Sequence, residues 1–222
     1  MLRNRARLPV LAEISGPGES RAWSLRRSDF TALEGVLPRL EQRRAVLVAG
    51  VGEAPAVTAI ALAAAAGATG RRTILVDCDL AQPRLGAHLG LGAAPGLHEY
   101  LRWEAEPADV LQPVALAGPA TGSSEPLVCI CGGRPATKAE TLLGLQSFAH
   151  MVEKLRGAYE LVLVLSPPVV SEPGACLAVA RQADAVVAGL AAGDSDRSLK
   201  AAIRRLPAPV LGAIKLASAQ RS

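Results

Sequence analysis

The stretch VAGVGEAPAVTAI, residues 48–60, joins an apolar run to an alanine-rich segment and decides the fold. The preceding residues AVLVA at 45–49 predict a buried strand, and residues 55–68 predict a helix of small side chains. A strand, a glycine-containing loop and a helix in this order form the phosphate-binding loop of many α/β proteins. This loop, however, contains no lysine, and Pro55 stands within it.

The composition indicates the class of protein. The chain has 222 residues, enough for one sizeable α/β domain, and half of them are hydrophobic while only 3% are aromatic. An apolar content made mostly of alanine, valine and leucine suits helices that pack closely on a parallel sheet. The net charge of +4 allows contact with an anionic membrane surface or an acidic partner, although a solvated basic surface is the simpler reading.

Two further absences bear on location and chemistry. The sequence has no run of ~20 uncharged apolar residues and no pattern of a secretory signal, so we expect a cytoplasmic protein that a partner could hold at the inner face of the membrane. The cysteines lack the spacing of a zinc site, and buried reduced thiols are the default expectation. They are Cys78, Cys129, Cys131 and Cys176.

Short apolar runs alternate with helical stretches along the chain. The predicted strands are 45–49, 73–77, 127–131, 161–165, 185–190 and 209–215. The predicted helices are 20–40, 55–68, 138–156, 173–182 and 195–205. Residues 112–126, rich in Pro, Gly and Ser, predict a loop. The alternation predicts an α/β fold, a doubly wound and mostly parallel sheet with helices on both faces, as one domain over 21–222 preceded by an arm, 1–20.

Two aspartates end the second predicted strand. Ligands of such sheets bind at the carboxyl ends of the strands, and Asp77 and Asp79 alternate there, so their side chains point to the same side. Two carboxylates could face a ligand or a magnesium shell. A turn in which an aspartate caps a helix is an equally good reading.

Ordered motifs extend from about residue 8 to about residue 215. They include RLPVLAEIS, the loop-to-aspartate stretch VGEAPAVTAIALAAAAGATGRRTILVDCDLAQPRLGAHLGL, and the later segments GLHEYL, AETLLGLQSF and YELVLVLSPPVV. In order and spacing this set resembles the polysaccharide-export tyrosine autokinases, the cytoplasmic partners of chain-length regulators in capsule and exopolysaccharide synthesis. That family belongs to the deviant-Walker P-loop NTPases, together with the Min and Par ATPases.

The resemblance implies which residues should carry phosphoryl transfer, and this chain lacks them. Pro55 stands at the lysine position and removes both a cation and a backbone donor. Ala56 stands at the position of the magnesium-binding hydroxyl and is followed by Val57, and Leu165 replaces the second metal-binding carboxylate. Each change removes a group that positions or stabilises the phosphates.

These comparisons define a vestigial nucleotide site. Its predicted members are Gly50, Gly52, Glu53, Pro55, Ala56, Val57, Asp77, Asp79 and Leu165. We expect no catalytic residue, no resident cofactor and no metal; if a metal binds at all, Asp77 and Asp79 would hold it. Weak binding of ATP and magnesium stays open, because one of Arg71, Arg72 and Arg84 could reach the site in the fold.

The resemblance implies a pseudokinase, a non-catalytic accessory protein of exopolysaccharide or capsule biosynthesis and export. It would bind a membrane chain-length regulator or a homologous active kinase. Two other functions stay open: a nucleotide-binding autokinase or ATPase with a rearranged site, and a Par- or Min-like positioning protein. A folded remnant with little function is a further alternative. No nucleic acid is expected, because a DNA-binding surface needs Lys and Arg clustered on one face, and segments such as RRLPAP and KLASAQRS offer little of this.

The helix that builds the family's oligomeric ring carries an acidic residue and two arginines at three-residue spacing. Ser20, Trp23 and Arg26 fall on those positions here, so the ring is in doubt, although another oligomer stays open. Trp23, Arg26 and Arg27 are the predicted partner contacts. Trp103 is another isolated aromatic residue, for which a partner contact and core packing are both open.

Overall fold

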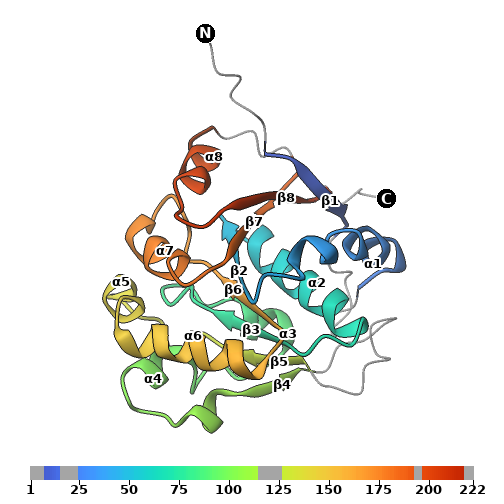
Figure 1. Ribbon diagram of the computed structural model, residues 1–222. Coiled ribbons are helices and arrows are strands. Elements are labelled where there is room, and N and C mark those ends of the chain that lie inside the picture. Colours follow the sequence, from blue (N-terminus) through green and yellow to red (C-terminus); the bar gives the residue numbers. More distant parts are fainter. Residues whose placement is uncertain (1–7, 16–24, 115–126, 193–196, 218–222) are drawn as a thin grey trace.

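The computed structural model describes residues 8–15, 25–114, 127–192 and 197–217, and all structural statements below concern these residues. Within them the strands form one eight-stranded sheet, in the order β1-β8-β7-β2-β6-β3-β5-β4 (Figure 1). The strands are β1 Val10–Ile14, β2 Ala45–Gly50, β3 Thr73–Asp77, β4 Gln112–Val114, β5 Leu127–Ile130, β6 Leu161–Leu165, β7 Ala185–Leu190 and β8 Val210–Leu216. Every neighbouring pair is parallel except β4 and β5. The predicted doubly wound α/β fold is confirmed.

Two edge strands were not predicted. β1 comes from the expected arm and pairs with β8, where Ala213 N–H donates to Pro9 O at 2.8 Å. β4 occupies the start of the expected loop 112–126, so that prediction is wrong for residues 112–114; residues 115–126 lie outside the described part. Pro113 masks this strand in the sequence, yet an edge strand tolerates proline because it pairs on one side only.

The helices flank the sheet. The α-helices are α1 Arg27–Glu34, α2 Ala54–Ala68, α3 Leu85–Leu89, α4 Leu97–Leu101, α5 Ala139–Leu143, α6 Gln146–Ala158, α7 Pro173–Ala180 and α8 Arg197–Arg204, and the 3₁₀ turns are η1 Leu37–Leu40 and η2 Pro107–Val110. The predicted helix 20–40 ends early, because Gly35 terminates α1 and Pro38 starts a separate turn. The predicted helix 138–156 is divided after Gly144, which ends α5.

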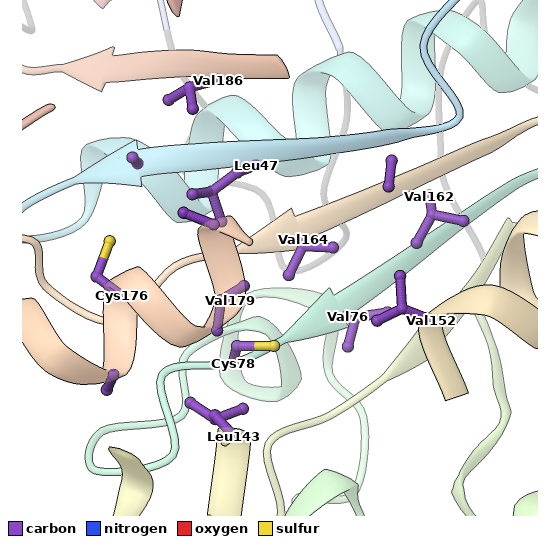
Figure 2. Packing of buried hydrophobic residues seen from close by; sticks show 14 of the residues in the cluster. Leu47, Val76, Cys78, Leu143, Val152, Val162, Val164, Cys176, Val179 and Val186 are labelled. Atoms are coloured by element: carbon purple, nitrogen blue, oxygen red, sulfur yellow. The ribbon is translucent and has the colours of Figure 1, made fainter. Parts of the chain in front are cut away.

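Each face of the sheet carries its own core. Alternate residues of β2 separate the two: Leu47 belongs to the cluster with α6 and α7, and Val48 to the cluster with α1 and α2. Figure 2 shows side chains of β2, β3 and β6, including Leu47, Val76 and Val164, gathered with residues of α6 and α7. α2 is buried continuously from Ala54 to Ala66, because its alanines allow close approach to the sheet.

Candidate functional site

The phosphate-loop position lies at the carboxyl end of β2. The strand ends at Gly50 and α2 begins at Ala54, so three residues make the turn. Gly52 has φ +67°, in the left-handed region that glycine adopts at little cost. Val57 N–H donates to Glu53 O at 3.1 Å, which closes the first turn of the helix. The local backbone is therefore a compact strand-to-helix turn.

Pro55 is buried against the ends of two strands. A Cβ atom added at Gly50 would lie 2.7 Å from Pro55 Cγ, and one added at Gly189 of β7 would lie 2.7 Å from Pro55 Cα. The first turn of α2 thus sits directly on the backbone of β2 and β7. At the position where the resemblance places a lysine, the proline ring fills space at the end of the sheet and offers neither a charge nor an N–H donor.

The replaced metal-binding positions are also apolar and buried. Ala56 and Leu165 belong to the core cluster between α2 and the sheet, and Val57, which follows Ala56 in the sequence, is also buried. Leu165 ends β6 and pairs in register with Asp77 of β3. The fold therefore brings Leu165 next to Asp77, as the resemblance implies, but contributes a hydrocarbon side chain instead of a second carboxylate.

Asp77 is fully buried and all its hydrogen bonds are internal. Its Oδ1 accepts from Asp79 N–H at 3.1 Å, and its Oδ2 accepts from Arg84 N–H at 2.7 Å and Leu85 N–H at 2.9 Å. These donors belong to the turn after β3 and to the start of α3, so Asp77 caps that helix. Burial raises the pKa of the Asp77 carboxyl to about 7, despite the three backbone hydrogen bonds, which act in the opposite direction.

Asp79 stabilises the same turn. Its Oδ1 accepts from Gln82 N–H at 3.1 Å and its Oδ2 from Arg84 Nε at 3.4 Å. Burial raises the pKa of Asp79, and the hydrogen bonds from Gln82 and Arg84 only partly offset it. Both predicted carboxylates thus hold the loop between β3 and α3. In the described part of the chain, no three His, Cys, Asp or Glu side chains gather as metal ligands.

A charged cluster beside the loop has no signal in the sequence pattern. Arg84 Nη1 donates to Glu53 Oε1, and His88 Nε2 lies 2.8 Å from Glu53 Oε2. Burial raises the pKa of Glu53, but the His88 hydrogen bond and the Arg84 charge outweigh it, so the net shift is downward. The cluster borders an open cavity of about 540 Å³, whose apolar lining includes Pro83, Ala87 and Pro135.

The three arginines considered as replacements for the lysine lie in different places. Arg84 lies at the cavity, where Glu53, Asp79 and Gln82 already accept its hydrogen bonds. Arg71 and Arg72 precede β3, at the amino ends of the strands and away from the loop, where Arg71 Nη2 donates to Glu160 O at 3.1 Å. Only Arg84 of these three can influence the vestigial site.

The remaining predicted residues lie elsewhere. Arg26 and Arg27 are exposed at the start of α1, and Trp23 lies outside the described residues. Cys78, Cys129, Cys131 and Cys176 are all buried and free, as expected. None of the described helices is both long and apolar enough to cross a membrane.

Comparison with known proteins shows which solved structures share this fold. No family model and no curated protein matches the sequence. The kinase domain of Escherichia coli tyrosine kinase ETK matches with a TM-score of 0.78 at 18% identity, covering 97% of this chain and 92% of that one. The chimerical protein CapA2B2 matches with a TM-score of 0.77 at 18% identity, covering 94% of each chain. The chain has the fold of the bacterial tyrosine kinase domains.

The same fold also occurs outside the kinase domains. The septum site-determining protein MinD from Pyrococcus horikoshii, solved with Mg-ADP, matches with a TM-score of 0.60 at 20% identity, covering 81% of this chain and 72% of that one. The kinase-domain structures cover a larger share of this chain than MinD does. The resemblance read from the motifs is thus confirmed at the level of the kinase-domain fold.

Proposed function

We propose that this protein is a non-catalytic relative of the polysaccharide-export tyrosine autokinases and acts by binding another protein. The observation that carries the proposal is Pro55, which packs on the ends of β2 and β7 where that family has its phosphate-binding lysine. Leu165 and Ala56 leave the magnesium positions without an oxygen ligand. Phosphoryl transfer depends on positioning and on stabilisation of phosphate charge, and these positions supply neither.

The expected loss of nucleotide affinity is large. A charge-assisted hydrogen bond contributes about 1.5–3 kcal/mol, so losing two or three costs several kcal/mol. Because ~1.4 kcal/mol corresponds to a tenfold change in affinity, the loss is on the order of a thousand-fold. The turn itself is retained, since proline is tolerated in the first turn of a helix, where N–H groups lack intrahelical partners.

A rearranged nucleotide site is the second candidate, and one observation favours it. Arg84 is a cation at a cavity of about 540 Å³ directly beside the vestigial loop. Its guanidinium, however, already pairs with the Glu53 and Asp79 carboxylates. A phosphate entering there would have to displace Glu53 and would meet its negative charge. A Par- or Min-like role has only the shared fold in its favour.

Titration with ATP and magnesium separates these candidates. In a calorimeter we expect no saturable heat up to millimolar nucleotide, with the wild type and the Arg84→Gln variant behaving alike. Saturable micromolar binding that Arg84→Gln abolishes would establish the rearranged site and overturn the non-catalytic reading. Binding that Arg84→Gln leaves intact would also overturn it.

The proposed function also requires a binding partner. The resemblance supplies the candidates, a membrane chain-length regulator at the inner face of the membrane or a homologous active kinase. Arg26 and Arg27 are exposed at the N-terminal end of α1 and are the proposed contacts. Exposed charges at the rim of an interface mainly set the association rate and its dependence on salt.

We expect the Arg26→Glu/Arg27→Glu double variant to bind the cytoplasmic segments of the regulator, or the kinase, at least about tenfold more weakly. The reason is reversal of charge in an interface, where 1.4 kcal/mol is a factor of ten. Acidic residues suit a helix N-terminus, so α1 should stay folded. Arg39→Glu, an exposed site on η1, is the matched control. Equal affinity of the wild type and the double variant would rule out this surface.

A further inference from the structure

Five adjacent strands begin side by side at the end of the sheet opposite the vestigial loop. They are β8, β7, β2, β6 and β3, in that order, and all neighbouring pairs among them are parallel. With about 4.8 Å between neighbouring strands, the row is about 19 Å wide. We call the loops that enter these strands, together with the last turns of the preceding helices, the amino-end surface.

The amino-end surface is rich in arginine. Six arginines lie in its loops: Arg43, Arg44, Arg71, Arg72, Arg181 and Arg205. Three more lie in the last turns of η1, α6 and α8: Arg39, Arg156 and Arg204. These arginines are spread from residue 39 to residue 205 of the sequence, so only the strand order brings them to one face.

Few carboxylates oppose this charge. The same loops and turns hold three, those of Glu41, Glu160 and Asp184. The amino-end surface therefore carries +6 within the described residues, whereas the whole chain carries +4, which leaves −2 for all other residues together. Counting also Glu34, Glu153 and Lys154, which lie further from the strands, still leaves an excess of +5. The positive charge is concentrated on one face.

Several of these guanidinium groups bond to carbonyl oxygens, which do not neutralise them. Arg44 Nη1 donates to Arg156 O at 3.0 Å, and Arg43 Nη1 donates to Asp184 O at 3.4 Å. Arg156 also pairs with a carboxylate, donating from Nη1 to Asp184 Oδ1 at 2.9 Å. The hydrogen bonds of Arg43 and Arg44 hold the side chains across neighbouring loops and leave their charge in place.

The stabilisation of helix ends does not use up the excess charge. The helices α2, α6, α7 and α8 all end at the amino-end surface. The C-terminus of a helix carries roughly −0.5 elementary charge, so four of them contribute about −2. This offsets less than half of the excess of +5. The remaining positive charge is available to an anionic partner outside the chain.

The shape of the surface favours a flat partner. Its loops are two to five residues long, so none can project far from the strand ends. Its one aromatic side chain in the described loops and turns is that of Tyr159, which is half-buried. Single-stranded nucleic acids bind through exposed aromatic side chains that stack on bases, and a duplex groove is read by a projecting helix or ribbon. A low basic surface without these features suits a plane of lipid phosphates.

We propose that the amino-end surface rests on an anionic lipid bilayer, with its arginines facing the headgroup phosphates. Guanidinium groups match the geometry of phosphate oxygens and bind two of them at once. An anionic leaflet attracts clustered arginines near its surface. The vestigial loop and its cavity, at the other ends of the strands, then face away from the bilayer. The proposal goes beyond the regulator contact and the lost catalysis, and requires neither.

Vesicle flotation tests the proposal on the protein alone, without nucleotide or regulator. We expect the wild type to float at low salt with vesicles of equal parts phosphatidylglycerol and phosphatidylcholine, and to be released at high salt, which screens the attraction. Arg72→Gln/Arg181→Gln/Arg205→Gln removes three exposed charges from the loops before β3, β7 and β8, and should bind at least about tenfold more weakly. Equal binding to pure phosphatidylcholine, or no binding of the wild type, would contradict the proposal.

A second triple variant, Arg102→Gln/Lys138→Gln/Arg197→Gln, is the matched control. It removes the same net charge from exposed side chains outside the amino-end surface, and should lose little affinity for the anionic vesicles. Equal losses in both triple variants would show an effect of net charge and overturn the assignment of the surface. Duplex DNA is compared at the same salt, where we expect weaker binding. DNA bound more tightly than the vesicles, through the same arginines, would overturn the assignment to lipid.

A fluorescent label reports which face meets the bilayer. The four native cysteines are buried, so Gln42→Cys and Thr137→Cys can each be labelled selectively. Both positions are exposed, the first in the loop before β2 and the second in the loop after β5. We expect anionic vesicles to protect the label at residue 42 from quenching by acrylamide and to leave the label at residue 137 accessible. Equal protection, or protection at residue 137 alone, would show that another face meets the lipid.

Discussion

Replacing Asp77 by alanine is expected to lower the free energy of unfolding by several kcal/mol. The substitution leaves three backbone donors without their acceptor: those of Asp79 and Leu85, which are buried, and that of Arg84, which is partly buried. Each buried donor left unpaired costs about 1–3 kcal/mol. Urea denaturation followed by circular dichroism measures the change. The resemblance predicts Asp77 as a nucleotide-site residue, so a large stability effect would show that it now stabilises the turn.

Asp109→Ala is the matched control, because Asp109 caps η2 by accepting from Glu106 N–H at 3.0 Å in an exposed setting. Loss of an exposed cap typically costs about 1 kcal/mol. If the two substitutions cost the same, the buried Asp77 hydrogen bonds would not be stabilising the loop between β3 and α3.

The same carboxyl should make stability depend on pH. Because burial raises the pKa of Asp77 from 3.8 to about 7, the folded state holds its proton more tightly than the unfolded chain does. The stabilisation is thus complete below the unfolded value and is lost as pH rises through about 7. The difference in unfolding free energy between wild type and Asp77→Asn should shrink as pH rises through this window. A difference that grows with pH would show that the three backbone hydrogen bonds outweigh burial.

Gly189→Ala is expected to destabilise the protein by about 3 kcal/mol or more, at the upper end for overpacking. The new methyl group would lie 2.7 Å from Pro55 Cα and 2.9 Å from Ala54 O. Both are backbone atoms at the start of α2, so no side-chain rotation relieves the clash. Either β7 or the first turn of α2 must move. Chemical denaturation measures the loss.

Gly67→Ala provides the control, because Gly67 lies in α2, the helix that the Gly189 methyl group would strike. A Cβ atom at Gly67 meets nothing within 4 Å. Alanine in a helix is about 0.5–1 kcal/mol more favourable than glycine, so this variant should be as stable as the wild type or slightly more so. A Gly189→Ala variant of equal stability would show that α2 can lift away from the sheet. That outcome would also mean that Pro55 does not pack rigidly on the ends of β2 and β7.

The sequence by itself determined the layers of the fold and the residue types at the phosphate-loop position. Continuous apolar runs such as LVLVL at 161–165 predict strands covered on both faces, because no residue of a buried strand can be polar without a partner. The order of motifs alone aligns Pro55, Ala56 and Leu165 with the lysine, hydroxyl and carboxylate of the family that the sequence resembles. The edge strands β1 and β4 were missed, since short segments next to proline carry no clear period.

Only the tertiary structure decided how the vestigial site is filled. Glu53 contacts Arg84 and His88, which are 31 and 35 residues away in the sequence. The contact forms because the loops that follow β2 and β3 both lie at the carboxyl ends of the strands. The contact of Pro55 with Gly189 likewise depends on β7 lying beside β2. Local patterns report periodicity and turn chemistry within a segment. Contacts between distant segments follow from strand order and packing, which no single segment encodes.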